Sequence, residues 1–308
     1  MILQKQISTR AWGELLLLGM VWGGVFLAAA IALEEIPPFT LVAIRISLAA
    51  LILWGVALLR GSRIPRGRRV WAALFVMGIL NNAIPFTLLT LGQTQIESGL
   101  TSIFNAGTAV FGILIAAMFL KDERLTSRKA IGVLLGLSGI IYTAGFDSLR
   151  NLDLRSLGQL ACIGATISYA FAGVWARKHL SGLSPDSATA GMLTGAALLT
   201  IPIALFAEGL PSFDYSTRTL GALLYYIPVA TAFAYLLYFR ILEMAGSANV
   251  LLVTLLVSPI AILLGVLVLS EALPARSYIG FGLIAAGLAV IDGRAFSTLR
   301  RSFMPKRT

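Results

Sequence analysis

The chain has 308 residues, of which 58% are hydrophobic and only 12% are charged, and its mean hydropathy is +0.88. A soluble domain carries roughly a quarter charged residues, so a water-soluble globular fold is excluded and a multi-span membrane protein is predicted. The net charge of +10 does not indicate nucleic acid, because the basic residues lie in short connectors between apolar segments.

Ten segments are long and apolar enough to cross a bilayer, since a spanning helix needs about 20 mainly apolar residues. The first is longer than the apolar region of a cleaved signal peptide, so we expect it to be a span. Pro202 interrupts the seventh, which is the weakest of the ten. The predicted spans are 12–33, 38–59, 70–92, 99–119, 129–146, 157–176, 188–207, 219–240, 248–269 and 278–293.

Lys and Arg predict the orientation of these spans, because cytoplasmic connectors are enriched in them. Of the 24 basic residues, nineteen lie in the connectors on the side of the N-terminus and four lie in the other connectors. Only Arg45 lies within a span. We therefore expect a multi-pass membrane protein with both termini in the cytoplasm.

One polar turn occurs twice in the chain. Residues 123–132 and 271–280 both fit E-x-L-x-x-R-x-x-I-G, and each copy lies between two apolar runs. Five helices per half is an odd number, so the second half must enter the membrane upside down. The predicted fold is therefore an all-α membrane protein of two inverted five-helix repeats, at 1–147 and 148–294, followed by a basic cytoplasmic tail at 295–308. Inverted repeats are a recurring architecture of secondary transporters, with the solute site near the midplane.

The third span carries two adjacent amides, Asn81 and Asn82, near its centre, and Pro85 follows them. Amides facing lipid would be costly, so at least one should face protein or water. Pro85 frees a backbone carbonyl one turn back, which a solute or a water could use. Two interpretations remain open: these residues line a solute cavity, or they hydrogen-bond between helices and only hold the bundle together.

The fourth and ninth spans are related by the repeat, and each presents a polar stripe at mid-depth. Asn105 and Thr108 lie one turn apart in the fourth span, and Thr254 and Ser258 do so in the ninth. Hydroxyl groups often bond only to their own helix backbone, so a solute-lining role and a structural role are both open.

Aromatic side chains at mid-depth add further candidates, because a buried phenol or indole needs a hydrogen-bond partner. Trp22, Tyr169 and Tyr226 are the three that we expect to line a cavity. Arg45 lies about 10 Å from the end of the second span, at 1.5 Å per residue. It could bind a carboxylate or gate the mouth of the cavity, or it could extend to the lipid headgroups.

Several of these residues together resemble a known family. Trp22-Gly23, Phe26, Arg45, Ser98-Gly99-Leu100, Asn105 and the doubled E-x-L turn occur here in order. With them, the chain resembles the drug/metabolite transporter superfamily and, within it, bacterial EamA-type exporters, over residues 12–143 and 158–292. The resemblance implies a basket of ten helices in a bacterial-type inner membrane, which opens alternately to either side and moves small metabolites, often amino acids, outward. Many relatives carry a proline in helix 4 near Ala109, whereas here only helix 9 keeps its proline, Pro259. We assign Pro259 a gating role. Without its proline, helix 4 is not assigned a hinge.

Sequence features of enzymes and cofactor sites are missing. There is no G-x-S-x-G, H-E-x-x-H or nucleotide-binding loop. The single cysteine, Cys162, excludes an internal disulfide and a cysteine-rich metal site. We expect no catalytic residue, no cofactor and no metal. No acidic residue lies at mid-depth, where proton-driven carriers commonly place one, so a carrier driven by the solute gradient is predicted.

Amides, hydroxyls and aromatic rings with at most one cation suit a neutral or zwitterionic solute, and amino acids fit best. A multidrug or nucleoside/sugar exporter is the alternative within the same class. Outside that class, a membrane scaffold or a lipid-processing enzyme stays possible. Glycines in the fifth and tenth spans have close-packing spacing and indicate a scaffold contact or a homodimer through these helices: Gly132, Gly136, Gly139, Gly280, Gly282 and Gly287.

Overall fold

The computed structural model describes residues 8–121, 125–145, 154–180, 182–245 and 253–292, and these residues contain helices but no strand. Two predicted features lie outside the described residues: Glu123, in the first copy of the repeated turn, and the basic tail at 295–308. The first half of the chain comprises α1 (Thr9–Ala32), α2 (Pro38–Leu59), α3 (Arg68–Gly78) with η1 (Ile79–Ala83) and α4 (Ile84–Gln93), α5 (Ser98–Ala106) with α6 (Thr108–Phe119), and α7 (Ser127–Ala144).

The second half repeats the pattern of the first. It comprises α9 (Leu154–His179), α10 (Pro185–Glu208), α11 (Thr217–Tyr226) with η2 (Pro228–Phe233) and α12 (Ala234–Ala245), α14 (Val253–Leu269) and α15 (Ala275–Asp292). Seven segments within the described residues are long and apolar enough to span a membrane, and two shorter apolar helices come from α14 and α15. With α7, they make up the ten predicted spans, and α10 continues through Pro202.

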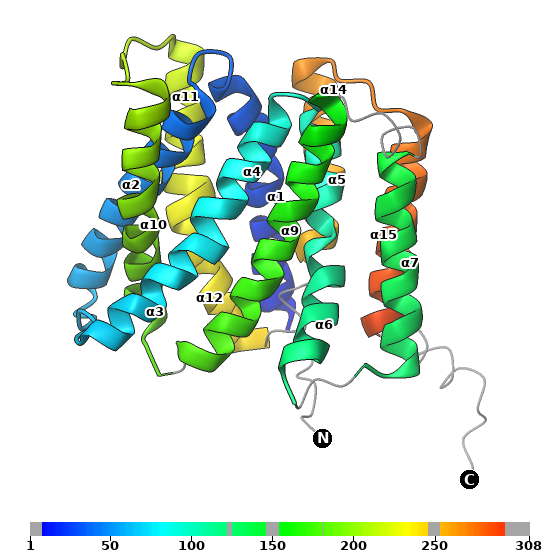
Figure 1. The fold of residues 1–308 in the computed structure, drawn as a ribbon, viewed down its shortest axis with the longest axis horizontal. Coiled ribbons are helices and arrows are strands. Elements are labelled where there is room, and N and C mark those ends of the chain that lie inside the picture. Colours follow the sequence, from blue (N-terminus) through cyan, green and yellow to red (C-terminus); the bar gives the residue numbers. More distant parts are fainter. Residues whose placement is uncertain (1–7, 122–124, 146–153, 181, 246–252, 293–308) are drawn as a thin grey trace.

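The two halves run in opposite directions across the molecule. We call the end at which α1 begins the N-terminal face and the other end the opposite face. Figure 1 shows α1 starting at the N-terminal face and α9, its counterpart in the second half, starting at the opposite face. The prediction of two inverted five-helix repeats is thus confirmed.

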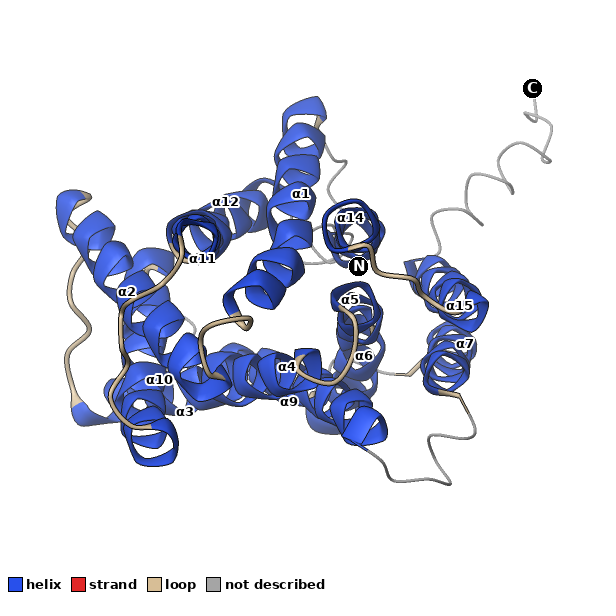
Figure 2. Cartoon of the chain, turned by 90° about the horizontal axis from the view of Figure 1, so that it is seen from above, coloured by secondary structure: helices blue, strands red, loops and turns tan. Residues whose placement is uncertain are grey.

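The helices α7 and α15 pack together at one edge of the molecule, and α2 and α10 pack at the other (Figure 2). Glycines allow the first pair its close approach, since a Cβ at Gly287 would lie 2.6 Å from the carbonyl oxygen of Gly132. The predicted glycine contact is therefore made within one chain. A homodimer through these helices stays a prediction, and it would use their outer faces, where Leu134 and Ile279 are exposed.

Candidate functional site

Each half contains one short π-helical segment in its third helix. The offset that relates Glu123 to Glu271 places η1 (79–83) on residues 227–231, which nearly coincide with η2 (228–233). A proline lies next to or within each segment, Pro85 after η1 and Pro228 at the start of η2, and proline removes a backbone N–H from the helix ladder. Such π segments occur frequently at functional sites.

A hydroxyl group bonds to a main-chain carbonyl at each of these interruptions. The Ser168 hydroxyl donates to the carbonyl oxygen of Leu80 (2.7 Å), and the Thr231 hydroxyl donates to that of Tyr226 (2.8 Å). The backbone acceptor near Pro85, which the sequence predicts to be available to a solute or a water, thus already has a protein partner. The binding chemistry of this region must therefore come from the side chains on η1 and η2, and not from a free backbone carbonyl.

The amides of η1 converge on Tyr235, which lies just beyond η2. The Asn82 Nδ2 donates to the Tyr235 hydroxyl at 2.8 Å, and the Asn81 Nδ2 lies 3.3 Å from the same oxygen. Asn82 is fully buried, and its Oδ1 has no hydrogen-bond partner among the described residues. A buried carbonyl oxygen without a donor is costly, so this atom is an open acceptor at mid-depth.

Arg45 reaches η2 from α2. Its Nε donates to the Thr231 hydroxyl (2.9 Å) and its Nη1 donates to the Tyr226 hydroxyl (2.7 Å). The guanidinium also lies over two aromatic rings, 3.9 Å from the centroid of Phe86 and 4.1 Å from that of Tyr226. Arg45 is only 6% exposed, so it does not extend to the lipid headgroups.

Tyr169 of α9 lies beside the residues just described. It packs between two apolar clusters, one around α5 and one around α2, and it lies near Tyr235, Arg45 and Tyr226. Its hydroxyl donates no hydrogen bond to a described residue. The structure thus brings together five of the predicted site residues, from four different stretches of sequence: Asn81, Asn82, Arg45, Tyr169 and Tyr226. We call these residues, with Thr231, Tyr235 and Phe86, the mid-span cluster.

The other predicted residues lie elsewhere. Asn105 and Thr108 flank a break in the fourth span at Gly107, where α5 ends and α6 begins. Their Oδ1 and Oγ1 atoms are buried and have no partner among the described residues. Gly107 therefore divides the fourth span into α5 and α6, and residue 109 in this span is an alanine rather than a proline.

In the ninth span, Ser258 is fully buried and donates to the main-chain carbonyl of Ser102 at 2.9 Å, which ties α14 to α5. Pro259 lies inside α14, which continues past it. Thr254 is half-buried and has an interaction partner. Trp22 packs on Tyr238, with ring centroids 5.7 Å apart, and none of these four residues contacts the mid-span cluster through a hydrogen bond that the structure shows.

Sequence reasoning missed Thr231, Tyr235 and Phe86 as site residues. In a regular α-helix, Thr231 lies five residues beyond Tyr226 and so on a different face. The π segment shifts the register, and Thr231 then bonds back to the carbonyl of Tyr226. Pro228 in the middle of an apolar span was the available signal for that shift.

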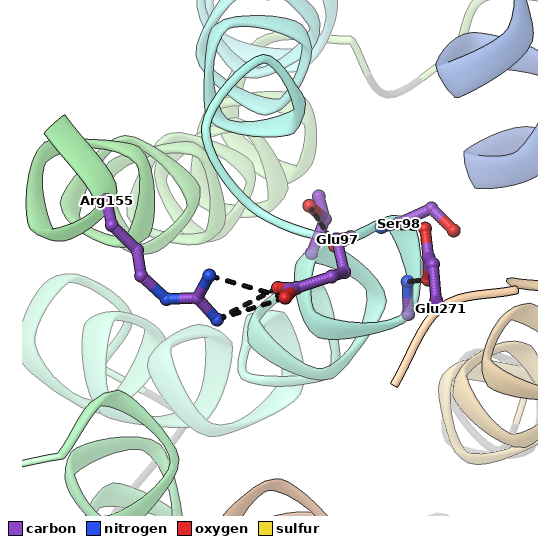
Figure 3. A network of polar contacts seen from close by, with 6 residues as sticks. Glu97, Ser98, Arg155 and Glu271 are labelled. Carbon is purple, nitrogen blue, oxygen red and sulfur yellow. Dashed lines mark hydrogen bonds and ion pairs between the residues drawn. The ribbon is translucent and has the colours of Figure 1, made fainter. Parts of the chain in front are cut away.

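At the opposite face, carboxylate side chains bind the ends of neighbouring helices through hydrogen bonds and an ion pair. Glu271, in the second copy of the repeated turn, accepts from the backbone N–H groups of Ser98 (2.7 Å) and Gly99 (3.0 Å) at the start of α5. Figure 3 shows this contact beside the ion pair of Glu97 with Arg155, at 2.9 Å. Glu208 caps α2 in the same way, through Phe39 and Thr40. Such bonds neutralise helix N-termini that would otherwise lack acceptors.

A further contact joins α4 to α1 near the opposite face. The Gln93 Nε2 donates to the carbonyl oxygen of Phe26 at 2.9 Å. The repeat offset relates this pair to Ile241 and Val174 at the N-terminal face, and these two side chains lie in separate apolar clusters. The first and third helices are therefore tied at the opposite face, while the equivalent pair at the N-terminal face is not.

Two open apolar hollows lie on the flank of the molecule, with volumes of about 200 Å³ and 220 Å³. The first lies between α2, α4 and α10, and the second lies between α2 and the end of α10. Neither hollow is lined by a predicted site residue.

Comparison with known proteins identifies the class of this architecture. The sequence profile of the EamA-like transporter family matches residues 11–145 and 156–292. The chain belongs to the EamA-like transporter family. The EamA-type resemblance found in the sequence is thereby confirmed, and the two matched segments correspond to the two inverted halves.

Relatives of this EamA-like transporter cover most of its length. The Bacillus subtilis protein described as the uncharacterized transporter YoaV is 22% identical over 87% of this chain and 92% of its own. The Escherichia coli protein described as the uncharacterized inner membrane transporter YedA is 25% identical over 91% and 90%. A crystal structure that is 22% identical shares the fold with a TM-score of 0.63, over 92% of this chain and 98% of that one.

Proposed function

We propose that this EamA-like transporter exports small metabolites, with amino acids as the main class, by alternating access and without covalent chemistry. The observation that carries the proposal is the mid-span cluster, in which a buried cation, phenols and an amide oxygen without a donor lie between the two halves. Inverted repeats of secondary transporters place their solute there. A cation beside an unoccupied acceptor matches the two ends of a zwitterion.

The orientation follows from charge. Nineteen of the 24 basic residues lie in the N-terminus-side connectors and at the ends of the chain, so we place the N-terminal face in the cytoplasm. YedA, one of the relatives, is described as an inner membrane protein, and we propose the same bacterial membrane for this chain.

The energy source that we propose is the gradient of the solute itself. Among the described acidic residues, Glu14 is the most deeply placed, and its carboxylate is held by Arg10 (3.2 Å) and Arg240 (2.6 Å) near the N-terminal face. Glu14 is thus engaged in two ion pairs near one face and lies away from mid-depth, where proton-driven carriers commonly place their relay.

Flux measurements on the purified protein in proteoliposomes test this function. The panel contains labelled amino acids, nucleosides and a lipophilic cation, each measured with and without an imposed proton gradient. We expect amino acids to be carried without the gradient, and Asn82→Leu to lower their flux at least about tenfold, because every 1.4 kcal/mol of lost binding is a factor of ten.

Monodispersity by size-exclusion chromatography verifies that the Asn82→Leu variant is folded. Flux of nucleosides or the cation alone would overturn the amino-acid assignment. Complete dependence on a proton gradient would overturn the energy source, and the absence of any protein-dependent flux would overturn transport.

A further inference from the structure

Arg45 is a buried cation that forms an ion pair with no carboxylate among the described residues. Among the described residues, the ion pairs involve Glu14, Glu34, Glu97 and Asp186, all of them near one face or the other. Arg45 is 6% exposed and takes part in none of them. Neutral hydroxyls and aromatic faces stabilise a guanidinium in part, but a buried charge without a counter-ion remains unfavourable.

The guanidinium still has donors to offer. Its Nε and one N–H of Nη1 are used by Thr231 and Tyr226. Among the described residues, Nη2 donates to none. The second N–H of Nη1 and the N–H groups of Nη2 together form the two-pronged end of the group, which matches a carboxylate. The rings of Phe86 and Tyr226 fix the plane of this fork.

We infer that Arg45 selects solutes by binding their carboxylate, so that the anionic end of the solute completes the charge balance of the mid-span cluster. This inference rests on the proposed function, because it names the group that the carried solute must possess. A single guanidinium with no second cation in the mid-span cluster fits a singly charged carboxylate better than a doubly charged phosphate. Asn82 Oδ1, which shares Tyr235 as a neighbour with Arg45, accepts the amino group.

A structural role for Arg45 predicts something different. If the arginine served only to join α2 to α11 and η2, its loss would destabilise the protein but would not change the preference between solutes. Comparing an amino acid with its amide separates the two roles, because the amide has the same size and side chain but lacks the negative charge.

The experiment measures the uptake of labelled leucine and labelled leucinamide into proteoliposomes, or the fastest amino acid of the panel and its amide. Protein-free liposomes give the leak of each probe. The wild type should carry the acid at least about tenfold faster than the amide, and Arg45→Gln should reduce this ratio to about one. Arg45→Lys, which keeps the charge but not the fork, should retain a ratio between the two.

Arg60→Gln is the matched control, because Arg60 lies at the end of the same helix and pairs with Asp186 at 3.2 Å. It should keep the wild-type ratio of acid to amide transport.

If Arg45→Gln does not fold, competition in the wild type decides, since unlabelled leucine should inhibit uptake and unlabelled leucinamide should not. Equal transport of acid and amide by the wild type would overturn this inference and leave the proposed function standing. An unchanged ratio in Arg45→Gln would do the same, whereas no flux of any solute would overturn both.

Discussion

The polar residues of the mid-span cluster are not required by the repeat architecture. The repeat offset relates Arg45 to Leu193, and Leu193 is a buried core residue. It relates Asn82 to Ala230, which is also fully buried. An apolar side chain therefore suffices at these positions for the fold of the second half. The cost of burying a cation and an amide in the first half thus indicates a function.

Tyr235 is the residue on which the two amides of η1 converge, so removing its hydroxyl should be costly. In Tyr235→Phe, the Asn82 Nδ2 is left buried without its acceptor, and we expect a loss of about 1–3 kcal/mol of unfolding free energy. Thermal unfolding in detergent micelles measures it. Tyr238→Phe is the control, because the Tyr238 hydroxyl has no hydrogen bond to a described residue. Equal unfolding temperatures for the two variants would contradict this role of Tyr235.

Glu35 makes the connection between α1 and α2 sensitive to acid. The Ser216 hydroxyl and the Ser216 backbone N–H, which donates at 2.8 Å, lower the pKa of Glu35 below its usual value of 4.5. A carboxyl group with a lowered pKa stabilises the folded state above its usual pKa, and this contribution is lost as the pH falls through the lowered value.

Acidification from about pH 6 to about pH 3 should therefore lower the unfolding temperature more in the wild type than in Glu35→Gln. Differential scanning fluorimetry across this range measures the difference. Parallel pH profiles for the two proteins would show that Glu35 does not contribute in this way.

At the scale of helices, the contact of α7 with α15 depends on glycine. A Cβ at Gly287 would meet the carbonyl oxygen of Gly132 at 2.6 Å and the backbone nitrogen of Gly136 at 2.8 Å. Backbone atoms cannot yield as flexible side chains do, so Gly287→Ala should cost about 1–3 kcal/mol through overpacking. Gly282→Ala on the same helix meets nothing within 4 Å. Thermal unfolding should separate the two variants, and an equally tolerated Gly287→Ala would argue against close backbone packing.

The bond between Gln93 and Phe26 should hold the opposite face closed. Replacing Gln93 by Leu removes the donor that joins α4 to α1 and should shift the population toward states open at that face. The readout is the modification of a Trp22→Cys variant, in a Cys162→Ala background, by an impermeant thiol reagent added at the opposite face.

Gln93→Leu should raise the modification rate about three- to tenfold, as expected for a shift of about 1 kcal/mol. Thr94→Val is the control, because the Thr94 hydroxyl makes only local bonds, donating to the carbonyl of Leu91 and accepting from the Nε2 of Gln95, and joins no second helix. If the modification rate rose equally in both variants, or in neither, Gln93 would not be the closing contact.

At the scale of the whole molecule, hydropathy predicts the spans well, because each apolar run must become a helix to satisfy its backbone in lipid. The repeated turn predicts the inversion, and the second copy has a structural reason, since Glu271 caps α5 of the other half. The mid-span cluster could be predicted only in part. Asn82 and Arg45 stand out as polar residues in apolar runs, whereas Tyr235 and Thr231 depend on the register shift of η2, which local sequence does not specify.

A solute site between the halves requires that the two halves be inverted across the bilayer. Single cysteines placed by Arg128→Cys and Arg276→Cys, in the Cys162→Ala background, lie at the starts of α7 and α15 in the two copies of the repeated turn. An impermeant thiol reagent on intact cells should label Arg276→Cys, and Arg128→Cys should react only after the membrane is opened. Labelling of both from the same side of the membrane would contradict the inverted arrangement and with it the site between the halves.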